Sequence, residues 1–331
     1  MRVFKFRQGR AGRGCIIALS SILSAPTPSL LAVELEYGAL LEIDWTRSTL
    51  RQSEQRSTAA DWSAGTLAMS LSAAFGPHWG ADLVLLAEDI GVTDHNDYLP
   101  ADGAEDKRPD RLHVDELTFG YTSENFDAAV GRMTLPFGRF ETALLSDPQT
   151  LEIGETQTEF GAHAVYRTGD VHFGAAAFNG NLRSIAPDRA GYAAYAGWEI
   201  EPLQLTLGYL SAQHAGKDAP ALVDLAAALH TGVWFVGAEW VGAPHTGRGQ
   251  QPRALHVEVG REFGSVWGAG LRYQQTSRFE VLDEGSGRFR EWAVGLNREL
   301  FELVHLGVEY AVGDEDGPRQ HLTLVRLTVE Y

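Results

Sequence analysis

The last ten residues place the strongest constraint on the fold of this chain. Apolar and polar residues alternate over Val325, Arg326, Leu327, Thr328, Val329, Glu330 and Tyr331. Successive side chains of a β-strand point to opposite faces, so this stretch predicts a strand with one apolar and one polar face. A strand of about ten residues with this pattern can cross a bilayer in a β-barrel or line a soluble sandwich. The number of times the pattern recurs decides between the two.

The same pattern recurs throughout the chain. Fifteen segments qualify as strands: 33–45, 66–75, 81–90, 112–121, 127–135, 159–167, 171–179, 191–200, 203–212, 233–242, 253–263, 266–276, 289–299, 302–312 and 322–331. Bacterial single-chain barrels have an even number of strands, with short periplasmic turns and longer outer loops. With both termini on the periplasmic side, strand directions can be counted from each end of the chain. Strands 203–212 and 233–242 then both run from the periplasm toward the outside, so a strand of the opposite direction must lie between them. Segment 220–229 supplies it, with a tight turn at 230–232, and we expect sixteen strands.

The connections alternate between short and long, as porin topology requires. Short turns are predicted at 76–80, 122–126, 168–170, 201–202, 230–232, 264–265 and 300–301. Long loops are predicted at 46–65, 91–111, 136–158, 180–190, 213–219, 243–252, 277–288 and 313–321. The sequence therefore predicts an all-β, antiparallel, up-and-down transmembrane barrel without a plug domain, since strands begin near Val33.

The N-terminus has the features of an export signal. Five basic residues precede an apolar stretch, Cys15–Ala25, which is too short to span a bilayer. We expect cleavage after Ala32, which gives a signal peptide at 1–32 and an outer-membrane barrel at 33–331. Cys15 is the single cysteine, so it would leave with the signal, and the mature chain would have no thiol chemistry.

Composition excludes several functions. Cleavage would leave 22 basic residues against 44 acidic ones, a net charge of −22. A nucleic-acid binder needs a basic surface, and this chain lacks one. HExxH, GxSxG and phosphate-loop motifs are all missing, so we expect no enzyme, no catalytic residue, no cofactor and no bound metal. The acidic stretch 94–110 could hold a divalent cation through oxygen ligands, but a solvated outer loop is favoured.

The polar face of each strand should line the channel. On this alternation the predicted pore-lining residues are Glu34, Glu36, Glu42, Asp44, Arg132, Glu239, Glu258, Arg272, Glu291, His305, Glu309, Arg326 and Glu330. Burying so many charges in a dry core would cost several kcal/mol each, whereas water in the lumen removes that cost. Sixteen strands also leave an aqueous channel.

Loop 136–158 is the candidate constriction. It is long, and its charged residues could fold into the channel: Arg139, Glu141, Asp147, Glu152 and Glu155. The alternative is an ordinary surface loop.

One block of sequence resembles a known family. Gly131–Thr142 (GRMTLPFGRFET), followed by Ser146-Asp147-Pro148 and Leu151–Thr156 (LEIGET), is similar to the LbtU family of outer-membrane siderophore porins. The resemblance implies a sixteen-strand barrel without a plug that takes up an iron-chelating siderophore. A shorter Pro-Phe-Gly element resembles the phosphate-selective porins, but the acidic, lysine-poor chain departs from what an anion pore needs.

Three functions therefore stay open. The first is a porin for a small solute, most specifically a ferric siderophore; the second is a general, cation-preferring diffusion porin; the third is a structural or adhesive barrel without transport. The expected location is the bacterial outer membrane. The expected partners are membrane lipid, the small solute or siderophore, and the barrel-assembly machinery through the strand that ends at Tyr331. Homo-oligomerisation is left open.

Overall fold

The computed structural model describes residues 33–52, 55–88, 90, 112–154, 157–179, 190–211, 221–244, 252–277, 288–315 and 319–331. The predicted signal peptide, the acidic stretch 94–110 and most of the predicted loops 180–190, 213–219, 243–252 and 277–288 lie outside these residues. No helix in the described part of the chain is both long and apolar enough to span a membrane.

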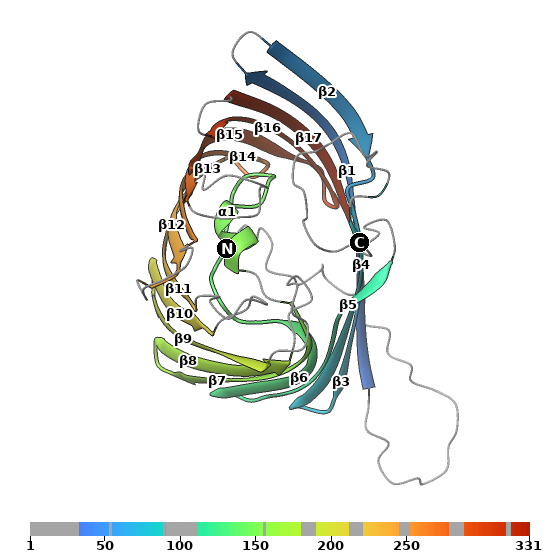
Figure 1. Cartoon of the computed structure of the whole chain (residues 1–331). Helices are drawn as coiled ribbons and strands as arrows, with labels where there is room; N and C mark the ends of the chain where they lie inside the picture. Colours follow the sequence, from blue (N-terminus) through green and yellow to red (C-terminus); the bar gives the residue numbers. More distant parts are fainter. Residues whose placement is uncertain are drawn as a thin grey trace, which may run out of the picture.

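The described residues form one antiparallel sheet with a single short helix (Figure 1). The elements are β1 (Val33–Gln52), β2 (Gln55–Ser63), β3 (Thr66–Phe75), β4 (Trp79–Glu88), β5 (His113–Thr122), β6 (Phe126–Thr134), α1 (Gln149–Gly154), β7 (Gln157–Thr168), β8 (Val171–Asn179), β9 (Ala190–Ile200), β10 (Leu203–Leu210), β11 (Leu222–Thr231), β12 (Trp234–Gly242), β13 (Arg253–Phe263), β14 (Trp267–Ser277), β15 (Arg288–Phe301), β16 (Val304–Glu315) and β17 (Arg319–Glu330).

The sheet closes on itself. β3 pairs with the first half of β1 and β2 with its second half, so β2 and β3 fill one place in the ring. β1 also pairs with β17 along Leu40–Arg51, which completes a closed barrel of 16 strands. The predicted fold class and strand number are confirmed.

Both ends of the described chain lie at the same end of the barrel. The amide of Ala39 donates to the carbonyl of Tyr331 at 2.9 Å, and the amide of Tyr331 donates back at 2.8 Å. All seven predicted short turns are present between consecutive strands at this end, from β3–β4 to β15–β16, and the last lies at residues 302–303 instead of 300–301. We call this the near end and the opposite one the far end.

The parity argument placed one strand correctly, and the loop prediction failed in two places. Segment 220–229 is β11, shifted two residues toward the C-terminus. The predicted loop 46–65 is wrong, because β1 continues to Gln52 and β2, Gln55–Ser63, pairs beside it. Loop 313–321 is also wrong, since β16 reaches Glu315 and β17 begins at Arg319. These strand extensions are polar and lack apolar alternation; backbone pairing with neighbouring strands holds them.

The outer wall carries the apolar side chains, as predicted. On β15, Trp292, Val294 and Leu296 are 57%, 51% and 47% exposed, whereas Ala293 between them is 2% exposed. Toward the near end, the guanidinium groups of Arg261 and Arg298 lie 4.8 Å from the rings of Trp234 and Trp267. An apolar band with aromatic residues near its edge is the surface that a bilayer requires.

The interior of the barrel is partly filled by the chain itself. Residues 135–154, which follow β6 and end with α1, lie inside the ring of strands (Figure 1). We call this stretch the inner segment.

Candidate functional site

Two glycines shape the path of the inner segment. Gly138 has φ +78°, and Phe140 follows with φ +53°, a left-handed conformation that is uncommon for a residue with a side chain. The Phe140 ring covers both Gly138 and Gly154, and a Cβ on Gly154 would lie 2.6 Å from its Cζ atom. Both glycines are therefore needed for the ring to occupy this place.

The ends of the inner segment are apolar and pack on the wall. Leu135, Phe137 and Ile153 are almost fully buried in a cluster with Met133, Ala176, Phe178, Ala193, Leu210, Leu222, Val241, Ala243 and Ala254. These wall residues lie toward the far ends of β6 and β8–β13, with Ala243 directly after β12. Burial of this apolar surface holds the segment against one side of the barrel.

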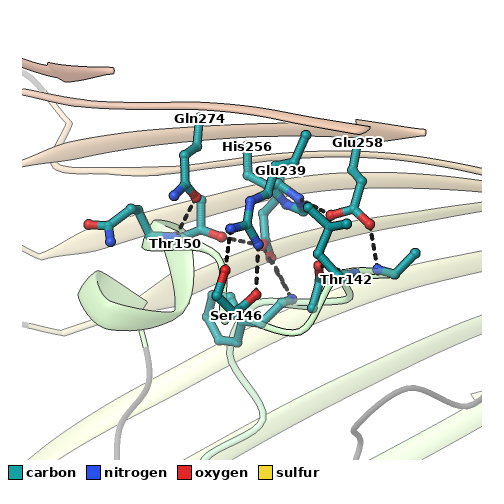
Figure 2. Close-up of polar contacts among 12 residues, drawn as sticks. Thr142, Ser146, Thr150, Glu239, His256, Glu258 and Gln274 are labelled. Atoms are coloured by element: carbon teal, nitrogen blue, oxygen red, sulfur yellow. Dashed lines mark hydrogen bonds and ion pairs between the residues drawn. The ribbon is translucent and has the colours of Figure 1, made fainter. Parts of the chain in front are cut away.

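Three carboxylates of the wall bind backbone amides of the inner segment. Figure 2 shows two of them, Glu239 and Glu258. Glu239 accepts from the amides of Arg139 and Phe140 at 2.6 and 3.1 Å and from the Thr150 hydroxyl at 2.8 Å. Glu258 accepts from the Ala143 amide and from the Thr142 hydroxyl, the latter at 2.8 Å. Glu309 accepts from the amides of Leu145 and Ser146 at 2.7 and 2.9 Å.

These contacts correct the argument that charged inward residues must face water. Glu239, Glu258 and Glu309 are only 4%, 1% and 1% exposed. The amides of the irregular part of the segment have no neighbouring strand to pair with, so each buried carboxylate and its amide donors compensate one another. At these three positions the negative charge serves to hold the inner segment.

Two arginines fasten the segment from the same side. Arg272 donates to the carbonyl and the hydroxyl of Ser146 at 2.7 and 2.6 Å, and its Nη2 lies 3.3 Å from Glu309. Arg326 donates two parallel hydrogen bonds to the carboxylate of Asp44, at 2.7 and 2.8 Å, and a third to the carbonyl of Leu145 at 3.0 Å. Paired, charge-assisted bonds of this kind fix geometry more strongly than neutral ones.

Polar contacts to the inner segment come from eight successive strands, β10 to β17. One inward side chain from each strand takes part: Gln204, His230, Glu239, Glu258, Gln274, Asn297, Glu309 and Arg326. We call this half of the barrel the covered wall.

The opposite side of the ring is different. Glu34 and Glu36 of β1, Asp82 of β4 and Glu116 of β5 share the inward face there, and the Ser72 hydroxyl donates to Asp82 at 2.6 Å. No lysine or arginine occurs in β3, β4 or β5. We call β3–β5 and the first half of β1 the acidic wall.

The structure brings most of the predicted site residues together. Those in direct contact with the inner segment, or with a side chain that binds it, are Glu42, Asp44, Glu239, Glu258, Arg272, Glu291, Glu309 and Arg326. Within the segment, Arg139 donates to Glu141 at 2.6 Å, and Asp147 is half-buried. The Glu152 side chain and Glu155 lie outside what the structure describes.

The remaining predicted residues lie elsewhere. Glu34 and Glu36 belong to the acidic wall, while His305 and Glu330 lie at near-end positions of β16 and β17. Arg132 departs from the alternation. The register places it opposite outward Leu117, beside an irregularity between Gly131 and Met133, and its Nε donates to the Asp115 carbonyl at 3.1 Å.

Sequence reasoning missed the neutral partners of the segment. Gln274 shares the inward face of β14 with Arg272, and Asn297 shares that of β15 with Glu291, so the alternation could have found both. Nothing in the pattern indicates that Thr142, Ser146 and Thr150 turn toward the wall. Within the described residues, no group of three or more His, Cys, Asp or Glu side chains is placed to hold a metal ion.

No protein-family model matches the chain, and no curated protein matches its sequence. Solved structures do match. An anion-selective porin from Comamonas acidovorans has a TM-score of 0.64 at 11% identity, over 90% of this chain and 100% of that one. OmpF of Salmonella typhi, in complex with daunomycin, gives 0.65 at 12% identity, over 90% and 98%. The outer membrane channel DcaP of Acinetobacter baumannii gives 0.62 at 11% identity, over 90% and 97%.

The likeness concerns the fold. The chain has the 16-strand barrel of outer-membrane porins. Identities near 11% do not extend to substrate, and membership of the LbtU siderophore family is not shown.

Proposed function

We propose that this protein is a passive channel of the bacterial outer membrane that admits small solutes and prefers cations. The inner segment narrows the channel, and solutes pass between it and the acidic wall. The observation that carries the proposal is the one-sided attachment of the inner segment to β10–β17.

The pore itself is supported by the fold. A barrel of sixteen strands is wide enough for an aqueous channel. The inner segment lies across this space, and its bonds to eight strands keep it close to the covered wall. The predicted constriction residues Arg139, Glu141 and Asp147 belong to this segment, and we assign them to the narrow part of the channel.

The cation preference is supported by the difference between the two walls. On the covered wall, Glu239, Glu258 and Glu309 are buried and bound to amides. On the acidic wall, Glu34, Glu36 and Asp82 are exposed. A channel lined by negatively charged carboxylates favours the passage of cations over anions.

Reversal potentials in a potassium chloride gradient test this function. Neutralising the acidic wall with Glu34→Gln, Glu36→Gln, Asp82→Asn and Glu116→Gln should lower the ratio of cation to anion permeability at least about twofold. The matched control neutralises four exposed acids of the short turns: Glu124→Gln, Asp170→Asn, Glu201→Gln and Glu302→Gln. Equal effects of the two variants, or an absence of conductance in the native protein, would refute the proposal.

Uptake of a ferric siderophore is the finer hypothesis, and its support is the sequence resemblance over residues 131–156. Because the acidic wall repels anionic chelates, a neutral or cationic ferric hydroxamate is a better candidate than a ferric polycarboxylate. Adding each chelate to a single conducting channel tests this directly. Block by the hydroxamate at micromolar concentration supports siderophore selectivity. If neither chelate alters the current, the protein is a general diffusion channel.

The outer-membrane proposal includes three partners. Bilayer lipid surrounds the apolar outer wall, the barrel-assembly machinery inserts the chain through the strand that ends at Tyr331, and copies of the barrel associate in the membrane. Chemical crosslinking in isolated outer membranes tests the last two.

A further inference from the structure

A row of arginines crosses five strands on the outside of the barrel. The registers place Arg290 of β15 opposite Asp314 of β16, Asp314 opposite Arg319 of β17, Arg319 opposite Arg51 of β1, and Arg51 opposite Arg56 of β2. Four of the five positions are cationic in a protein whose net charge is −17.

This row lies on the lipid-facing side, beyond the apolar band at the far end. Arg290 alternates with inward Glu291 and shares its face with Trp292 and Val294, which are more than half exposed. Arg51 shares its face with Trp45, whose ring lies 6.4 Å from that of Trp62 on β2. All four arginines are exposed, and each lies at the far end of its strand.

A hollow opens in the wall at one end of the row. Its volume is about 580 Å³, and it is lined by Tyr273, Arg290, Trp292, Val312, Asp314 and Arg319. Apolar Trp292 and Val312 lie one step along their strands from Arg290 and Asp314 toward the apolar band. The hollow therefore combines an apolar floor with two guanidinium groups and one carboxylate, a net positive charge.

We propose that the row and its hollow bind the phosphorylated headgroup of a lipid in the outer leaflet. The guanidinium groups of Arg290 and Arg319 bind phosphate oxygens in pairs, and an acyl chain lies against Trp292 and Val312. Charge complementarity selects this occupant, because Asp314 is the one acid among four arginines of the row, so a neutral lipid would leave the excess positive charge uncompensated. A free anion would leave the apolar floor uncovered. Arg51 and Arg56 extend the cationic surface to a neighbouring headgroup.

Lipid retention in native mass spectrometry tests the assignment. The purified barrel, in neutral detergent, is mixed with diphosphorylated lipid A, with monophosphorylated lipid A and with inorganic phosphate as competitor. Arg290→Gln with Arg319→Gln should weaken retention of the diphosphorylated lipid about tenfold. Arg51→Gln with Arg56→Gln should weaken it less, because these residues lie outside the hollow.

The matched control replaces two outward arginines of the near end, Arg261→Gln with Arg298→Gln, and should retain lipid as the native barrel does. Heat-modifiable migration on a gel confirms that each variant is folded. Equal retention by all variants, or equal loss in the control, would overturn the assignment. Displacement of the lipid by millimolar inorganic phosphate would identify a free-anion site and would also overturn it. The inference uses the proposed outer-membrane location, but the assay measures no current, so it can fail independently of transport.

Discussion

The covered wall and the acidic wall have the same strand geometry but use their inward acids differently. Glu239 and Asp82 are both carboxylates on the inner face of an antiparallel strand. Glu239 is 4% exposed and holds two backbone amides, whereas Asp82 is exposed and accepts from the Ser72 hydroxyl. The difference shows that an inward charge acquires its role from what the chain places in front of it.

The most severe test of this comparison is removal of Arg272. Its side chain and that of Glu309 are each 1% exposed, so Arg272→Met would leave a buried carboxylate without its cationic partner. We expect a loss of about 3–5 kcal/mol in stability and a noisier, wider channel as the inner segment detaches. Heat-modifiable gel migration and single-channel recording measure both effects. Exposed Arg261→Met is the control, and matching midpoints for the two variants would contradict the structural role of the covered wall.

A smaller effect is expected from the inner segment itself. Gly138→Ala places a Cβ at φ +78° and against the Phe140 ring, which should cost roughly 1–3 kcal/mol and change the conductance. Gly169→Ala meets the same backbone restriction at φ +56° with nothing within 4 Å. This control should lose about 1 kcal/mol and conduct normally. An altered conductance in the control would show that glycine strain anywhere in the barrel affects the channel.

The smallest effect is expected from Thr150, and it tests whether the covered wall contributes to ion selectivity. Thr150 is fully buried, and its hydroxyl donates to Glu239 at 2.8 Å. Thr150→Val should cost about 1 kcal/mol of stability and leave ion selectivity unchanged, because the acidic wall is untouched. Thr58→Val on exposed β2 should change stability by less than about 0.5 kcal/mol. A shift in reversal potential caused by Thr150→Val would mean that Glu239 contributes to selectivity after all.

Alternation predicted the barrel well because a side-chain period of two is a local property of each strand. The alternation predicted which residues of β12–β17 face inward. Together with the rule that strand numbers are even, it also predicted β11. It failed at β2, where Gln55–Asp61 has no apolar face and pairing with β1 alone maintains the strand.

The site was predictable only in part. Glu258 and Glu309 could be assigned to the interior, but their burial depends on the path of residues 135–154, which follows from long-range contacts. Arg132 shows the other limit, since one irregular residue beside Gly131 shifts the face of the next.

The seam between β1 and β17 has a consequence for the order in which the molecule is assembled. Tyr37 and Tyr331, which meet there, are 294 residues apart in sequence, so this contact carries the largest loop-closure entropy, while hairpins such as β13–β14 form locally. Arg326 of β17 reaches both Asp44 across the seam and Leu145 of the inner segment. This three-way contact is complete only when the seam is closed and the inner segment is in place. We therefore expect Arg326 to couple closure of the barrel to docking of the inner segment.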